Sequence, residues 1–94
     1  MEELAYQLSL LDNNALYLFT INKVTVQGIY AEFELTIQTS SKKLLSRWSI
    51  RCNHCFKAHI DKTDLAREVT IKYDIFIVGS SYFSGSHFSA TRLN

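Results

Sequence analysis

Residues 44–60 read LLSRWSIRCNHCFKAHI, and this stretch decides the fold. Its even positions from 48 onward are nearly all apolar, whereas its odd positions are mostly polar. The even positions are Trp48, Ile50, Cys52, His54, Phe56, Ala58 and Ile60. A period of two sustained over such a span is typical of one long β-strand that buries one face and exposes the other.

The length and composition of the chain predict one folded domain. Its 94 residues are 47% hydrophobic and 13% aromatic, which is enough apolar material for a core without disulfides or metals. We therefore expect a single small domain over residues 1–94. Residues 80–94, rich in serine, glycine and aromatic side chains, are expected to be a C-terminal tail.

The N-terminal segment has the spacing of a short amphipathic helix. Leu4, Leu8 and Leu11 recur at intervals of four and three residues, which places them on one helical face. We predict a helix over residues 2–12, and Asp12-Asn13-Asn14 is expected to end it.

Two irregular features are predicted between residues 15 and 37. Asn22-Lys23 suggests a two-residue hairpin turn, because asparagine tolerates a positive φ. The apolar positions then change from even to odd at Gln27-Gly28, which is typical of a β-bulge. The segment thus contributes one strand before the turn and a second, bulged strand after it.

The loop at residues 40–43 sets the pairing of the central hairpin. Counting back from Thr39 opposite Leu44 places Leu35 opposite Trp48, so the two apolar faces coincide. On the outer face the same count places Glu32 opposite Arg51 as a cross-strand ion pair.

The last predicted strand spans residues 69–78. Its apolar inner positions are Val69, Ile71, Tyr73, Ile75 and Ile77. Phe76 and Val78 would then point outward, and we expect the tail either to lie over that outer face or to become ordered only when a partner binds. The preceding residues 62–68 form either one helical turn capped by Thr63 or a plain loop.

These elements predict an α+β fold. An N-terminal helix packs on one face of a four-stranded antiparallel β-sheet, with the strand of residues 44–60 in its centre. Short connections make a meander the simplest topology, and the same strands are compatible with a partly closed barrel.

The chain contains no recognisable catalytic motif or phosphate-binding loop, so we expect no enzyme and no cofactor. Cys52 and Cys55 have a spacing used by zinc ligands and redox pairs. In an extended strand, however, they point to opposite faces, and His87 leaves too few further ligands for a closed site. We predict no metal site, a buried Cys52 and an exposed Cys55.

Basic residues gather on the central hairpin. Residues 35–60 contain no acid, although the net charge of the chain is only +1. Such asymmetry indicates either an anionic partner or internal pairing between strands. The candidate partner-binding surface combines outer-face cations with polar and aromatic residues. These are Tyr30, Arg47, Arg51, Asn53, Lys57, His59 and Phe76.

We expect a small non-catalytic protein-binding module, for example an inhibitor, immunity or anti-defence protein that blocks a larger target with an acidic surface. The alternative is a nucleic-acid or nucleotide-binding module that uses the same basic face. A homodimer is compatible with both hypotheses.

The sequence also bears on location. No run approaches the ~18 apolar residues that cross a bilayer, and Met1-Glu2-Glu3 is acidic where a signal peptide is basic. The two cysteines do not form a secreted disulfide framework. We expect a cytoplasmic protein without a membrane partner.

Overall fold

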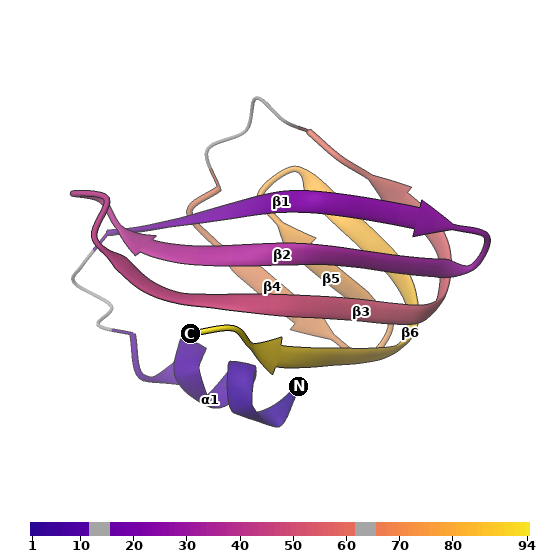
Figure 1. The fold of residues 1–94 in the computed structure, drawn as a ribbon, viewed down its shortest axis with the longest axis horizontal. Helices are drawn as coiled ribbons and strands as arrows, with labels where there is room; N and C mark the ends of the chain where they lie inside the picture. The colour runs from indigo at the N-terminus through magenta and orange to yellow at the C-terminus, as the bar shows by residue number, and fades with distance from the viewer. Residues whose placement is uncertain (12–15, 62–65) are drawn as a thin grey trace.

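The computed structural model describes residues 1–11, 16–61 and 66–94. These residues form one helix and one six-stranded antiparallel sheet. In chain order the elements are α1 (Glu2–Ser9), β1 (Tyr17–Gln27), β2 (Tyr30–Thr39), β3 (Leu44–His59), β4 (Val69–Lys72), β5 (Ile75–Val78) and β6 (Ser81–Arg92). The spatial order of the strands is β1-β2-β3-β6-β5-β4. Figure 1 shows that the sheet curls, so that β1, β2 and β3 lie in front of β4 and β5.

The expectation of a four-stranded α+β meander is wrong, because the described chain is mostly sheet and has six strands. Residues 69–78 form two strands, since the chain reverses at Tyr73-Asp74. The expected tail is β6, which lies between β3 and β5. A second tight turn containing Gly79, with a φ of 60°, joins β5 to β6. Among the described residues the sheet is curled but not closed, and β1 and β4 are its edges.

A two-residue turn moves the apolar alternation by one position, and this explains the error. Val69 pairs with Val78, and Ile71 pairs with Phe76, so these four side chains lie on the same face. Phe76 and Val78 are buried, whereas Tyr73 at the turn is 94% exposed. The sequence prediction continues the alternation through the turn, and it therefore wrongly places Tyr73 in the core and Phe76 on the outer face.

In the first hairpin, the predicted turn and the predicted bulge exchange places. β1 continues through Asn22 and Lys23, and its register against β2 shifts between Asn22 and Thr25. One extra residue there forms a bulge, with Lys23 at a φ of 53°. The chain reverses instead at Gly28, whose φ is 58° and which lacks the Cβ that makes this conformation costly.

The predicted pairing of the central hairpin is confirmed over most of its length. Leu35 lies opposite Trp48, and Glu32 lies opposite Arg51. Only next to the loop does the register shift, and Leu44 pairs with Gln38. The register holds because a slip by one residue would turn one apolar face outward.

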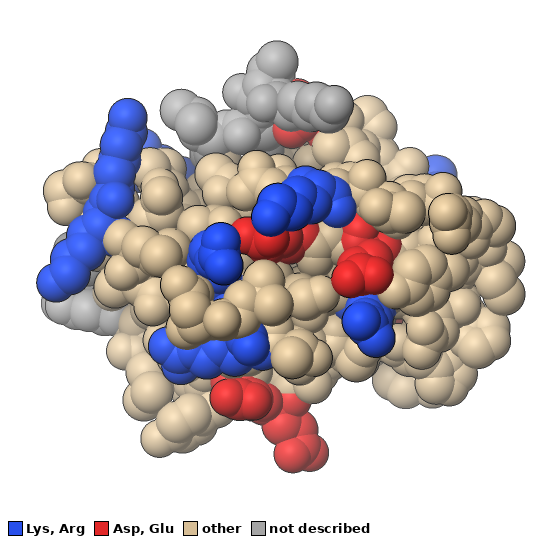
Figure 2. Space-filling view, viewed as in Figure 1, with Lys and Arg blue, Asp and Glu red and all other residues tan. Residues whose placement is uncertain are grey.

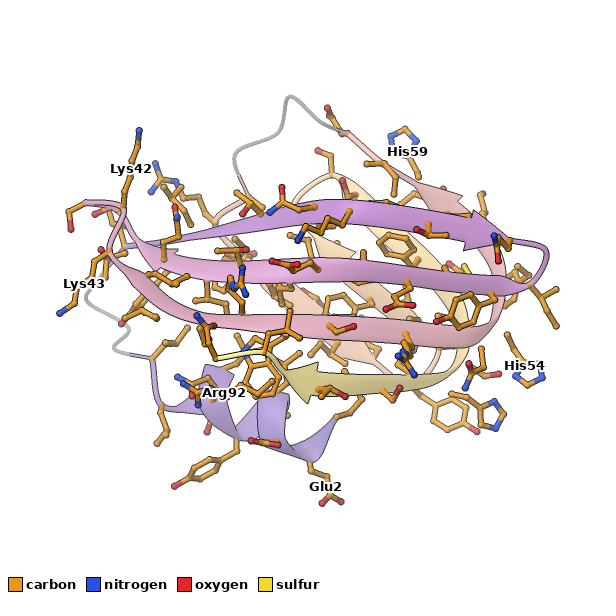
Figure 3. All side chains as sticks on the ribbon, in the orientation of Figure 1. Glu2, Lys42, Lys43, His54, His59 and Arg92 are labelled. Carbon is orange, nitrogen blue, oxygen red and sulfur yellow. The ribbon has the colours of Figure 1, made fainter. Side chains whose placement is uncertain are left out.

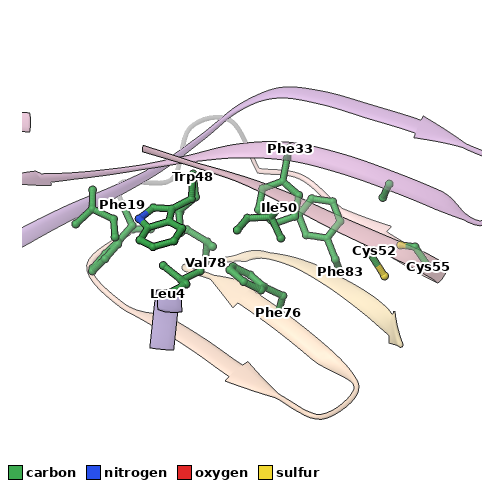
Figure 4. Close-up of a cluster of buried hydrophobic side chains, with 14 residues drawn as sticks. Leu4, Phe19, Phe33, Trp48, Ile50, Cys52, Cys55, Phe76, Val78 and Phe83 are labelled. Carbon is green, nitrogen blue, oxygen red and sulfur yellow. The ribbon is translucent and has the colours of Figure 1, made fainter. Parts of the chain in front are cut away.

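The core lies between the two halves of the curled sheet. Phe33 of β2 stacks on Phe83 of β6 with ring centroids 4.2 Å apart. Phe33 also meets Phe76 of β5 edge-on, at a centroid distance of 5.4 Å. Figure 4 shows these rings in one buried cluster with Ile50 and with Trp48, which is fully buried. Strands that are distant in the sheet order thus share one aromatic cluster.

The predicted N-terminal helix is present as α1, which packs beside β6. Leu4 is fully buried, and Leu8 and Leu11 pack partly buried against the same core, as their spacing predicted. The predicted helix end at residues 12–14 and the cap at Thr63 lie outside the described residues.

β3 and β6 bend together near their middles. The buried side of β3 changes from Cys52 to Cys55, and Cys55 lies opposite Gly85 of β6. The strands approach so closely that a Cβ on Gly85 would lie 2.6 Å from the Cys52 Sγ and 2.8 Å from the Cys55 Cα. His87, two residues on, has a positive φ of 57°. The prediction of an exposed Cys55 is therefore wrong, because the bend brings both cysteines into the core.

Candidate functional site

The residues of the predicted binding surface do not form one patch. Tyr30, Arg47 and Arg51 lie on the outer face of β2 and β3, and we call this region the convex face. Lys57 and His59 lie beyond the bend of β3, and Figure 3 places His59 well away from the middle of β2 and β3. The bend therefore divides a surface that a straight strand would have kept together.

Two glutamates pair with the cations of the convex face. The Arg47 Nη1 lies 3.4 Å from the Glu34 Oε1, and the Lys23 Nζ lies 3.4 Å from the Glu34 Oε2. The Arg51 Nε lies 3.8 Å from the Glu32 Oε1. Figure 2 shows acidic side chains interleaved with basic ones on this face. Internal pairing thus reduces the attraction of the convex face for an anion.

Glu32, which pairs with Arg51, also accepts two hydrogen bonds. The Tyr30 hydroxyl donates a hydrogen bond to the Glu32 Oε2, and the Ser49 hydroxyl donates to the Oε1 at 3.3 Å. The bond from Tyr30 is the main reason that the pKa of Glu32 lies below its usual value, and Arg51 lowers it further. The same bond raises the pKa of Tyr30. Glu32 therefore stays a carboxylate and offsets the charge of Arg51.

Lys57 and His59 lie around the ring of Tyr82 on β6. The Lys57 Nζ lies 5.8 Å from the centroid of the Tyr82 ring on β6, and the His59 ring stacks on it at 5.7 Å. The register of β3 against β6 shifts between Cys55 and Lys57. This group is a small cation–aromatic cluster, in which Lys57 and His59 are exposed and Tyr82 is half-buried, and it is separate from the convex face.

Phe76 and Asn53, the last two residues of the predicted binding surface, lie in different environments. Phe76 is fully buried in the core, so the expectation that it contacts a partner from the outer face is wrong. Asn53 is exposed at the bend of β3. The partner-binding role of Asn53 and of the other exposed residues stays a prediction.

A cleft of about 580 Å³ lies at the seam where the curled sheet stays open. Residues 19–24 of β1 line one side. Ile60, Ala66, Val78 and Ser81 contribute to the other side. This volume lies within the ~300–1,000 Å³ that is usual for ligand pockets.

The edge of β1 borders this cleft. The Phe19 N–H donates a hydrogen bond to the Ala66 carbonyl at 3.0 Å, which forms an isolated bridge across the seam. Alternate residues of a strand direct their backbone groups to the same edge. The backbone N–H and C=O of Ile21 therefore face the cleft, and among the described strands only β2 pairs with β1.

Sequence reasoning missed the cleft for a physical reason. The apolar character of Phe19 and Ile21 was visible, but Ile60 and Val78 come close to them only because the sheet curls. No local pattern indicates that two strands at opposite ends of a sheet order lie face to face.

The two cysteines are buried in the core. Burial, and to a lesser extent the neighbouring Cys55, raise the pKa of the Cys52 thiol to about 11. Sulfur–carbonyl contacts to Ser86 at 3.6 Å and Lys57 at 3.5 Å hold the two thiols. A thiol with a raised pKa is a poor nucleophile at neutral pH. Within residues 1–11, 16–61 and 66–94, no group of three or more metal-ligating side chains gathers.

In the part of the chain that the structure describes, no helix has the length and apolar character to cross a bilayer. Three candidate sites lie on the surface: the cleft beside β1, the convex face and the cation–aromatic cluster. No family model, no curated protein and no solved structure matches the chain.

Proposed function

We propose that this chain is a non-catalytic protein-binding module that takes up an extended segment of a larger partner along the edge of β1. The observation that supports the proposal is the 580 Å³ cleft beside that edge. An added strand forms backbone hydrogen bonds with such an edge, and its alternate side chains fill neighbouring pockets. A module that occupies a segment of a larger protein in this way blocks it, as an inhibitor or immunity protein does.

The lining of the cleft suggests the chemistry of the bound segment. Ile21 and Val24 on β1, and Ile60 and Val78 on the other side, line the cleft together with polar residues that include Asn22, Lys23 and Asp61. Apolar side chains of the partner would be removed from water there, at about 25 cal/mol per Å² of apolar surface. We therefore expect the segment to carry apolar residues at alternate positions.

The bulge of β1 limits where a strand can be added. The extra residue between Asn22 and Thr25 interrupts the regular edge, and Lys23 places a charge there. Edge bulges and lysines are common devices against indiscriminate strand pairing. Because the Phe19 N–H is already bonded to the Ala66 carbonyl, pairing is confined to residues 20–22, so the added strand is short.

The convex face supports partner binding less well. Glu32 and Glu34 offset its arginines, which weakens its attraction for an acidic protein. The same ion pairs disfavour the nucleic-acid alternative, because phosphate binding depends on cations that are free to replace counterions.

Selection from a library of random peptides tests the proposal, with two variants at one position. Ile21→Pro removes the N–H that faces the cleft, a change that an edge strand tolerates. Ile21→Ala loses side-chain packing but keeps that N–H. We expect the selected peptides to bind Ile21→Pro about tenfold more weakly than Ile21→Ala, with both variants folded by circular dichroism.

Equal affinities of the two variants for every selected peptide would contradict binding at the edge. Peptides that instead lose affinity on Arg51→Glu or Lys57→Glu would move the site to the convex face or the cation–aromatic cluster. Capture of partners from a cell extract that is lost on nuclease treatment would favour nucleic acid.

A further inference from the structure

Two histidines from different strands meet at the bend of β3 and β6. The Nδ1 atoms of His54 and His87 are 3.1 Å apart. Their ring centroids are 4.8 Å apart, and the ring planes are inclined by 52°. The Ser86 hydroxyl lies 3.0 Å from the His87 Nδ1. Both imidazoles are exposed, and Figure 3 shows His54 projecting from the end of the sheet.

The fold itself holds the two rings together. His54 pairs with Ser86 in the β3–β6 ladder, so His87 is the next residue along β6. The positive φ of His87, 57°, is uncommon for a residue with a side chain. Gly85 keeps the two backbones in close approach at the same point. The distance between the imidazoles is therefore set by the bend.

This distance suits two ligands of one metal ion. Imidazole nitrogens bind Zn²⁺ at ~2.0–2.1 Å, and two such bonds at octahedral to tetrahedral angles hold the nitrogens about 2.9–3.4 Å apart. The observed 3.1 Å lies within this range. We propose that His54 and His87 bind a divalent transition-metal ion such as Zn²⁺, Ni²⁺ or Cu²⁺ through their Nδ1 atoms, with water at the remaining positions.

The proton balance of the site is simple. Without metal, a hydrogen bond between the two Nδ1 atoms requires a proton on one of them and a lone pair on the other. When the ion binds, the proton of that ring moves to its Nε2, and both Nδ1 lone pairs point to the metal. The thiols of Cys52 and Cys55 lie in the core and take no part.

Thermal unfolding of the whole chain with added Zn²⁺, Ni²⁺ or Cu²⁺ tests the site. An ion that binds only the folded chain raises the unfolding midpoint, and the rise grows with the logarithm of the free-ion concentration. His54→Gln and His87→Asn each remove one ligand, and asparagine also tolerates the positive φ at position 87. The exposed His59 lies on the same strand, so His59→Gln is the matched control.

We expect all three ions to raise the midpoint of the wild type and of His59→Gln, with Cu²⁺ the most effective. The shift should be lost in His54→Gln and in His87→Asn. No shift in the wild type, or an equal shift in all variants, would overturn the proposal. Electron paramagnetic resonance with Cu²⁺ gives a second readout, because two coupled nitrogens are expected in the wild type and one in each single variant. Two nitrogens in either variant would also refute the site.

Discussion

Gly85 is the residue on which the bend of β3 and β6 depends. A Cβ at this position would lie 2.3 Å from the His54 carbonyl oxygen, and backbone cannot yield as a flexible side chain does. The glycine thus permits the close approach that brings the cysteines inward and the two histidines together.

We expect Gly85→Ala to lower the free energy of unfolding by at least about 2 kcal/mol, because the added methyl group overpacks a buried site. Urea unfolding measures the change. Gly28→Ala is the matched control, since a Cβ there meets nothing within 4 Å and only the positive φ is strained. That strain costs roughly 1–2 kcal/mol. An equal or larger loss in Gly28→Ala would contradict the role assigned to Gly85.

Ionisation of the Cys52 thiol makes the free energy of unfolding depend on pH in the alkaline range. Burial raises the pKa of its thiol from the ordinary 9.0 to about 11. Between these values the folded chain holds a proton that the unfolded chain has released, so stability falls as pH rises through this window. We expect the difference in unfolding free energy between wild type and Cys52→Ala to be constant below pH 8 and to shrink from pH 9 to 11. A constant difference throughout, measured by urea unfolding, would show that Cys52 does not contribute.

Among the elements, β6 is essential although its sequence resembles a loop. It pairs with β3 on one side and with β5 on the other, so the two halves of the sheet are joined through it. We expect a chain that ends at Ser80 to lose its cooperative unfolding transition. Removal of residues 93–94, which follow β6, is the control and should leave the transition in place. A cooperative transition in the chain ending at Ser80 would contradict this role of β6.

The bulge in β1 stores a small strain at Lys23. A non-glycine residue at a φ of 53° costs roughly 1–2 kcal/mol. Glycine avoids this cost, but its greater conformational freedom in the unfolded chain offsets part of the gain in stability. We expect Lys23→Gly to stabilise the protein by up to about 1 kcal/mol in urea unfolding. Lys23→Ala keeps the strain and loses only the exposed ion pair with Glu34, so it should change stability by less than about 0.5 kcal/mol. Destabilisation by Lys23→Gly would contradict the strain.

At the scale of the whole molecule, one core connects the helix and the curled sheet. Its buried residues come from α1, from β1, β2, β3, β5 and β6, and from Ala66, which precedes β4. Trp48 is the single tryptophan of the chain and is fully buried in this core. Phe19, Ala66 and Val78 belong to this core and also line the cleft beside β1.

A single core predicts a single unfolding transition. We expect Trp48 fluorescence and far-ultraviolet circular dichroism to report the same urea midpoint, because loss of the core and loss of the sheet are one event. Earlier loss of the fluorescence signal would show that the two halves of the sheet separate before the strands do.

The sequence by itself determined the features that depend on neighbours along the chain. The period of two in residues 44–60 indicated β3, the leucine spacing indicated α1, and the coincidence of apolar faces specified the pairing of β2 with β3. The Glu32–Arg51 ion pair followed from that pairing. These predictions succeeded because each rests on alternation within one element or on one short loop.

Only the tertiary structure decided which alternation continues past a turn or a bend. The reversal at Tyr73-Asp74 and the bend at Gly85 each change which positions face the core, and the placement of Phe76 and Cys55 changed with them. Curling of the sheet then brought Ala66 to Phe19 and created the cleft. Alternation specifies faces only relative to the same strand, whereas the choice of inner face and of neighbouring strand depends on burying the whole core at once.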